Sequence, residues 1–149
     1  MRSSKQALLA YCLVTGLTAS LVLGPATPAA GLALRGRMFN IVNSTREHHG
    51  VDPVKLNIEL SKFARRHSQR MADRGYLFHS TRVADELRPY TWSSYGEILG
   101  EGGTLRQVRD LWMDSPEHRS ILLGRSFRKC GVGIVRKGGV VWVTVIFYG

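Results

Sequence analysis

Residues 140–147 read Val-Val-Trp-Val-Thr-Val-Ile-Phe, and this stretch decides the fold. Its odd-numbered positions are all apolar, and Trp142 and Ile146 make the other side largely apolar as well. A strand that is apolar on both sides is covered on both sides. A second run rich in β-branched residues, 130–135, precedes it, and Lys137-Gly138-Gly139 has the composition of a hairpin turn. The sequence therefore predicts an α+β fold, a three-layer α-β-α sandwich with a central antiparallel sheet.

Several segments before this hairpin carry the 3.6-residue apolar period of helices that cover a sheet. Start and stop signals divide them into four helices. The first predicted helix covers residues 34–49 and is ended by Gly50, and the second is capped by Asp52-Pro53 or Asn57 and ended by Gly75. The third opens at Thr104, and Gln107 completes its capping box. The fourth is short, with Ser115 as its cap and Pro116 at its first position.

The first thirty residues have the pattern of a secretory signal. Arg2 and Lys5 are followed by an apolar stretch, residues 7–23, and then by small residues up to Ala30. The alternative is an uncleaved membrane anchor formed by residues 7–23. We expect residues 1–30 to direct export, so that the protein is secreted, and residues 31–149 to form a single domain.

The formal charge of +10 indicates attraction to anionic partners. Phospholipid headgroups, anionic wall polymers and nucleic acid all carry the required charge, so association with a membrane surface is one expectation. The alternative is a basic face that is simply solvated. No basic run alternates with aromatic residues, and we therefore expect no sequence-specific nucleic-acid binding.

Three side chains at the ends of predicted elements are candidates for a functional site. His79 ends the segment Gly75-Tyr76-Leu77-Phe78-His79, Glu97 follows Gly96, and His118 lies in the first turn of the short helix. A helix N-terminus disfavours imidazolium, so His118 is expected to be neutral. Imidazole and carboxylate are the groups that metal ligation or proton transfer requires. Residues 80–95 show no period, and we expect a long surface excursion between His79 and Glu97.

The other histidines and the cysteine of the expected domain are predicted to have structural roles. His67 lies on the apolar side of the second helix and is predicted to be a hydrogen-bonded core histidine. His48 and His49 end the first helix, where a cation complements the helix dipole. Cys130 begins a strand beside a glycine, where a small buried hydrophobic residue is expected rather than a reactive thiol.

At this point the chain resembles the CAP superfamily, also called the SCP domain, which includes cysteine-rich secretory proteins and plant pathogenesis-related proteins. It is most similar to the short bacterial branch. The resemblance covers about residues 38–149, and it depends on the order and spacing of several pieces rather than on any single one. Those pieces are Asn43-Ser44-Thr45-Arg46, Gly50, Leu56, Leu60, Ala64, His67, Met71, residues 75–79, Gly96-Glu97, residues 112–122 and Gly131-Val132-Gly133.

The resemblance implies an α-β-α sandwich in which His79, Glu97 and His118 face one shared cleft. Two histidines and one carboxylate with open positions could hold zinc or another divalent ion weakly. Many eukaryotic members have a second glutamate at the position of Ser115, so a tight four-ligand site is not expected here. Glu101 is a candidate substitute acid if its segment is helical.

Two further family positions differ, because Ile98 and Ser120 stand where asparagines are usual. Each replacement removes a side-chain amide that could stiffen the cleft.

Three functional hypotheses follow. The first is a secreted binding module for a lipid, a sterol or an anionic cell-wall component, held in the cleft. The second is a hydrolase in which a histidine acts as general base and Glu97 orients it. Ser80 and Ser115 lie near the histidines, but neither has the surroundings of a nucleophile elbow. The third makes the trio a buried polar network that only stiffens the loops.

Overall fold

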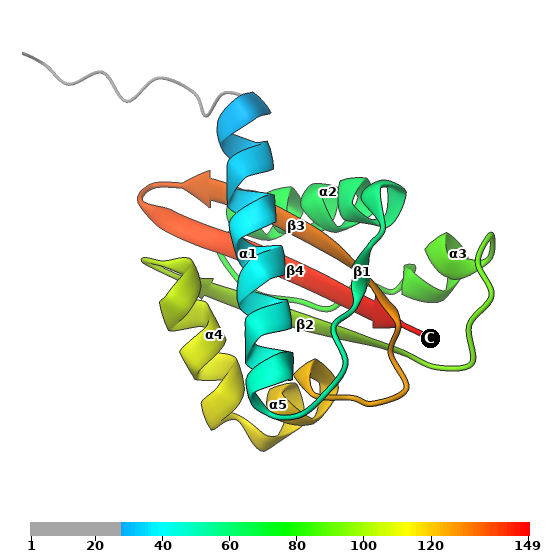
Figure 1. Ribbon diagram of the computed structural model, residues 1–149. Helices are drawn as coiled ribbons and strands as arrows, with labels where there is room; N and C mark the ends of the chain where they lie inside the picture. Colours follow the sequence, from blue (N-terminus) through cyan, green and yellow to red (C-terminus); the bar gives the residue numbers. More distant parts are fainter. Residues whose placement is uncertain (1–27) are drawn as a thin grey trace, which may run out of the picture.

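The computed structural model describes residues 28–149, which form three layers (Figure 1). A four-stranded sheet of order β1-β3-β4-β2 lies in the middle. Helices α2 and α3 cover one face of the sheet, and α1, α4 and α5 cover the other. This arrangement confirms the predicted α-β-α sandwich. The elements are α1 (Pro28–His48), β1 (Lys55–Leu56), α2 (Ile58–Arg74), α3 (Val83–Leu87), β2 (Tyr95–Gly102), α4 (Leu105–Asp114), α5 (Pro116–Leu122), β3 (Lys129–Lys137) and β4 (Val140–Tyr148).

The predicted leader falls mainly outside the described residues, and its apolar stretch 7–23 lies wholly outside them. Helix α1 begins at Pro28, six residues earlier than the predicted start. Between residue 28 and the last residue, no helix is both long enough and apolar enough to span a bilayer.

The predicted hairpin forms the centre of the sheet. Strands β3 and β4 pair antiparallel along their whole length, and Gly138 and Gly139 turn the chain with φ values of 58° and 80°. Both angles lie in the region that glycine tolerates best, as a two-residue hairpin turn demands. Strand β2 pairs antiparallel with the other side of β4. The two-residue β1 pairs parallel with β3, which is the one departure from an antiparallel sheet.

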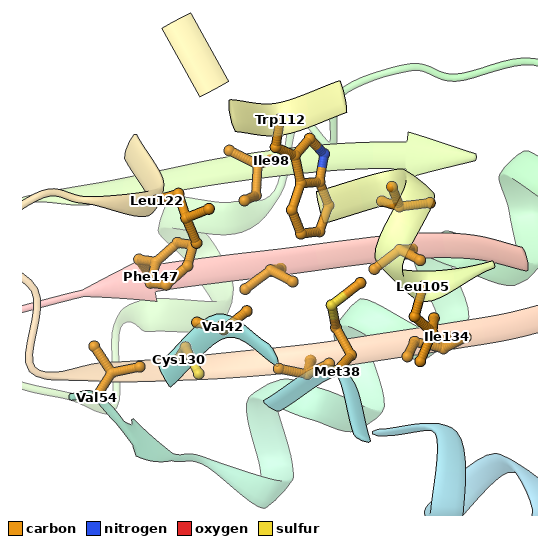
Figure 2. Close-up of a cluster of buried hydrophobic side chains, with 14 of the residues drawn as sticks. Met38, Val42, Val54, Ile98, Leu105, Trp112, Leu122, Cys130, Ile134 and Phe147 are labelled. Carbon is orange, nitrogen blue, oxygen red and sulfur yellow. The ribbon is translucent and has the colours of Figure 1, made fainter. Parts of the chain in front are cut away.

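The two faces of β4 enter different parts of the core, as its sequence predicts. Val143, Val145 and Phe147 point to the side of α1, α4 and α5, whereas Trp142 and Ile146 pack under α2 and α3. Figure 2 shows the first of these clusters, in which side chains from three helices meet over the sheet. The labelled members are Met38, Val42, Val54, Ile98, Leu105, Trp112, Leu122, Cys130, Ile134 and Phe147.

Helix α2 has the caps that the sequence predicts. The side chain of Asn57 accepts a hydrogen bond from the backbone N–H of Leu60, and Gly75 ends the helix in the left-handed conformation. The helix lies very close to β3, since a Cβ on Gly133 would overlap the backbone at Ala64 and Arg65. Glycine at this position therefore sets the distance between helix and sheet.

Two segments differ from the prediction. Residues 80–95 contain the short helix α3, and its Val83 and Leu87 are buried against α2 and β4, so the segment is anchored rather than wholly superficial. The segment containing Glu97 and Glu101 is the edge strand β2, so the helical segment that the role of Glu101 as a substitute acid required is not present. The short apolar run in this segment was too brief to distinguish strand from helix by periodicity.

Candidate functional site

The turn after α2 determines where His79 lies. Gly75 closes the helix with φ 77°, and its N–H donates to the carbonyl of Met71. Three residues later, the carbonyl oxygen of Phe78 lies 2.7 Å from Nε2 of the buried His67. Because this bond ties the turn back to α2, His79 leaves the turn in a fixed direction.

Glu97 reaches His79 from the edge strand. Side chains alternate along β2, so Ile98 enters the core under α4 and α5, while Glu97 and Leu99 face the α2 side. Oε1 of Glu97 lies 2.8 Å from Nδ1 of His79 and accepts a hydrogen bond of 3.0 Å from the backbone N–H of Ser80. The structure therefore brings together two members of the predicted trio.

The pair combines one buried and one exposed group. The side chain of Glu97 is 5% exposed, whereas that of His79 is 68% exposed. Oε2 of Glu97 is buried and has no hydrogen-bond partner among the described residues. Since a carboxylate oxygen accepts, Nδ1 of His79 donates to it, and in the neutral ring Nε2 keeps its lone pair toward solvent. An imidazole oriented in this way can accept a proton or a hydrogen bond from a bound molecule.

His118 has a different partner. Its Nδ1 lies 2.8 Å from Oγ of Ser115, and no hydrogen bond or ion pair described here joins it to the pair. The reason lies in the two faces of β2. A Cβ on Gly96 would lie 2.7 Å from a methyl carbon of Ile121, so α5 packs on the face of β2 opposite to the carboxylate of Glu97. Ser115 is the N-cap residue of α5 and Pro116 its first helical residue, as predicted, but the hydroxyl of Ser115 makes no cap hydrogen bond to the backbone.

A preformed metal centre does not fit this arrangement. Over residues 28–149, no three His, Cys, Asp or Glu side chains are grouped so that they could hold a metal ion. The one buried carboxylate near His79 already accepts two hydrogen bonds through Oε1. We therefore derive no step through zinc, and weak binding of a divalent ion stays a prediction.

A pocket of about 470 Å³ opens beside His79, and arginines are its most frequent lining residue. Three of them, Arg66, Arg70 and Arg74, are spaced by four residues on α2 and form one row. Their spacing was visible in the sequence, but only the packing of residues 78–86 against α2 encloses them. The lining residues are Phe63, Arg66, His67, Arg70, Arg74, Phe78, His79, Ser80, Thr81, Arg82 and Glu86.

The structural interpretations of two other residues are confirmed. His67 is fully buried with both ring nitrogens hydrogen-bonded, and burial lowers its pKa below the ordinary value. Cys130 is buried as well, and desolvation of the thiolate raises the pKa of its thiol to about 12, so the group is unreactive.

The remaining polar candidates lie apart from the pair. His49 bonds through Nδ1 to the carbonyl of Thr45 at 2.8 Å, consistent with its predicted role at the end of the first helix. Glu101 is exposed, and four residues along a strand separate it from Glu97 by about 13 Å. The hydroxyl of Ser120 donates to the carbonyl of Glu117 within α5.

Comparison with known proteins agrees with this architecture. A model of the cysteine-rich secretory protein family, CAP, matches residues 39–147. The uncharacterized protein YkwD of Bacillus subtilis is 29% identical over 120 residues, which are 76% of this chain and 47% of that protein. An extracellular protein containing an SCP domain from Bacillus anthracis superposes with a TM-score of 0.70 at 24% identity, over 84% of this chain and 44% of the other.

A cysteine-rich secretory protein from Staphylococcus aureus gives a TM-score of 0.69 at 20% identity, over 82% of this chain and 40% of that one. The chain thus spans less than half the length of these three relatives. At these identities the two solved structures show that the fold is shared.

Proposed function

The chain belongs to the cysteine-rich secretory protein (CAP) family, and we propose that it is a secreted binding module for a lipid, a sterol or an anionic cell-envelope component. The ligand is held in the pocket beside His79 and Glu97. The observation that carries this proposal is the contact of 2.8 Å between Glu97 and His79, because His79 lines a pocket of about 470 Å³. A volume of this size is typical of sites for small organic ligands.

The surroundings of the pocket support a ligand that has both apolar and anionic parts. Tyr76 and Leu77, in the same turn as His79, are 54% and 39% exposed. Phe63 and Phe78 supply aromatic surface inside the pocket, and arginines supply positive charge. Exposed apolar side chains next to cationic ones are the combination that binds the surface of an anionic membrane.

An extracellular location is part of this proposal. The charged start of the chain, its apolar stretch 7–23 and the small residues before Ala30 support export. The structural relatives from Bacillus anthracis and Staphylococcus aureus are described as extracellular and secretory proteins, respectively. Immunoblotting of the culture medium and of the membrane fraction of washed cells tests the location. Protein found only in the membrane fraction would favour an uncleaved membrane anchor formed by residues 7–23.

The binding proposal is tested on protein recovered from its native host. Solvent extraction followed by mass spectrometry should release a lipid, sterol or envelope fragment in about equimolar amount to the protein. His79→Gln should lose it, whereas His48→Gln, which changes an exposed histidine at the end of α1, should retain it. Wild-type protein that is folded and empty, and that retains no radiolabelled lipid above a heat-unfolded control, would leave the pair with a structural role only.

A second candidate function is hydrolysis, which the same contact favours. An imidazole oriented by a carboxylate and exposed at its other nitrogen has the arrangement of a general base. Glu97 orients the ring, Nε2 of His79 takes a proton from water, and the water oxygen attacks the electrophilic atom of the ester. The bond to the alcohol or phenol leaving group then breaks, and the imidazolium returns the proton to that leaving group. Turnover of a nitrophenyl ester should then fall about a hundredfold in His79→Ala. Activity that is unchanged in both His79→Ala and His118→Ala would belong to a contaminant.

A further inference from the structure

The pocket beside His79 is lined by four arginines from two elements. Arg66, Arg70 and Arg74 lie in a row on α2, and Arg82 is the residue that precedes α3. All four side chains are exposed at the opening. Their charges therefore meet across a concave surface rather than pointing outward over a convex one.

The guanidinium groups on α2 are positioned by aromatic rings and by a hydrogen bond, and not by ion pairs with carboxylates. Nη2 of Arg70 donates to Nδ1 of His67 at 2.9 Å, and His67 is itself buried. The guanidinium carbon of Arg74 lies 4.7 Å from the centre of the Phe78 ring. That of Arg66 lies 5.9 Å from the centre of the Phe63 ring. Contacts of this kind orient the planar group. Apart from the bond that Arg70 gives to His67, they leave the N–H donors of these guanidinium groups for another partner.

The positive charge of this pocket is not neutralised by the protein. Over the described chain, none of the four arginines forms an ion pair with a carboxylate, although five other ion pairs are present. Glu86 is the one acidic residue in the lining, and Glu97 lies behind His79 with its carboxylate buried. Like charges four residues apart on a helix repel each other. An anion bound between them would relieve that repulsion.

We propose that the pocket binds the phosphate group of a phosphate ester through Arg66, Arg70, Arg74 and Arg82. This inference rests on the proposed function and names the chemistry of its ligand. A guanidinium presents two parallel N–H donors that match two oxygens of a phosphate, and a phosphate has enough oxygens to serve several guanidinium groups. The hydroxyls of Ser80 and Thr81, at the same rim, supply further donors.

The ester is favoured over the free ion because the pocket is larger than a phosphate. A volume of about 470 Å³ leaves room for an organic portion, and the rings of Phe63 and Phe78 line that room. The same phosphate chemistry could come from a soluble ester or from a phospholipid headgroup. The experiment distinguishes these two sources.

Binding is measured on the full chain by titration calorimetry at low ionic strength with three probes: inorganic phosphate, glycerol 3-phosphate, and vesicles of phosphatidylglycerol in phosphatidylcholine. The test variant is Arg66→Gln/Arg74→Gln. Its matched control is Arg37→Gln/Arg106→Gln, which removes the same charge from exposed positions on α1 and α4, on the other face of the sheet. Thermal unfolding of both variants verifies that each one folds.

We expect wild type to bind glycerol 3-phosphate more tightly than inorganic phosphate. The test variant should bind glycerol 3-phosphate at least about tenfold more weakly than wild type does, because it loses hydrogen bonds from charged groups to the phosphate. The control variant should bind like wild type. If the protein binds the vesicles but neither soluble phosphate, and if the test variant loses this binding while the control retains it, the phosphate belongs to a lipid headgroup. Equal binding by wild type and the test variant, or an equal loss in the control, overturns the proposal.

These outcomes separate the inference from the proposed function. If the test variant still carries the host ligand at the wild-type level, the pocket is a binding site but the arginines do not recognise phosphate. If wild type carries no host ligand yet binds glycerol 3-phosphate through Arg66 and Arg74, the phosphate site stands and the proposed function fails.

Discussion

Nε2 of the buried His67 lies 2.7 Å from the carbonyl oxygen of Phe78, the residue before His79. A carbonyl only accepts, so Nε2 carries the proton. Nδ1 lies 2.9 Å from a guanidinium nitrogen of Arg70, which only donates, so Nδ1 accepts and the ring is neutral. One core histidine therefore positions both the turn that bears His79 and one arginine of the pocket.

The neutral state of His67 predicts a specific loss of stability in acid. Burial is the main cause that lowers the pKa of His67, with Arg70 and His79 contributing, while the bond to Phe78 and the charge of Glu97 oppose the shift. The unfolded chain binds a proton at this residue below about pH 6.5, whereas the native state binds it only at a lower pH. The free energy of unfolding should thus fall as pH drops below that value and level off below the lowered native pKa.

Urea unfolding at intervals between about pH 4 and 8 measures this slope. In His67→Gln the overall stability should be lower, but this part of the pH dependence should disappear, because glutamine does not titrate. Identical slopes for wild type and variant would mean that other histidines cause the acid sensitivity.

Gly133→Ala tests the close approach of α2 to the sheet. A Cβ at this position would overlap backbone atoms at Ala64 and Arg65, which cannot move aside without shifting the helix. We expect a loss of about 2–3 kcal/mol in the free energy of unfolding, as for overpacked cores. Gly36→Ala in α1 is the control, since a Cβ there meets nothing within 4 Å. It should stabilise the chain by about 0.5–1 kcal/mol, because alanine favours helix.

Arg46 is a buried cation without an ion pair among the described residues, and its removal should be costly. Its guanidinium donates to the carbonyls of Asp52, Leu122 and Gly124, and so joins α1 to the end of α5. Arg46→Met should leave these carbonyls without a donor and reduce stability by about 3 kcal/mol. The same change at the exposed Arg37 should have little effect, and equal stability of the two variants in thermal unfolding would contradict the assignment.

Zinc titration tests the sequence-based expectation of a weak divalent site. Because no three suitable side chains are grouped within residues 28–149, we expect weak binding that does not depend on His118. His118→Ala should alter the affinity by less than about twofold, or roughly 0.4 kcal/mol. An equal and large loss in His79→Ala and His118→Ala would show instead that the two histidines share the ion.

Much of the site was accessible to sequence reasoning, because the signals are local. Gly75 marks the end of α2, so His79 was expected in a turn, and Glu97 was expected at an element end. The strand character of β2 was missed, and with it the position of Glu101, because eight residues containing three glycines have little periodicity. The contact of Glu97 with His79 could not come from spacing alone, since 18 residues separate them.

The sequence by itself determined the layers. An apolar pattern on both sides of residues 140–147 requires cover on both sides, and helix caps are set by neighbours a few residues apart. Only the tertiary structure decided which polar groups meet. Glu97 faces α2 while α5 carries His118 on the other face, and the arginine row becomes a pocket only where residues 78–86 close over it. Periodicity records which face of an element is buried, but the partner across that face depends on how distant elements pack.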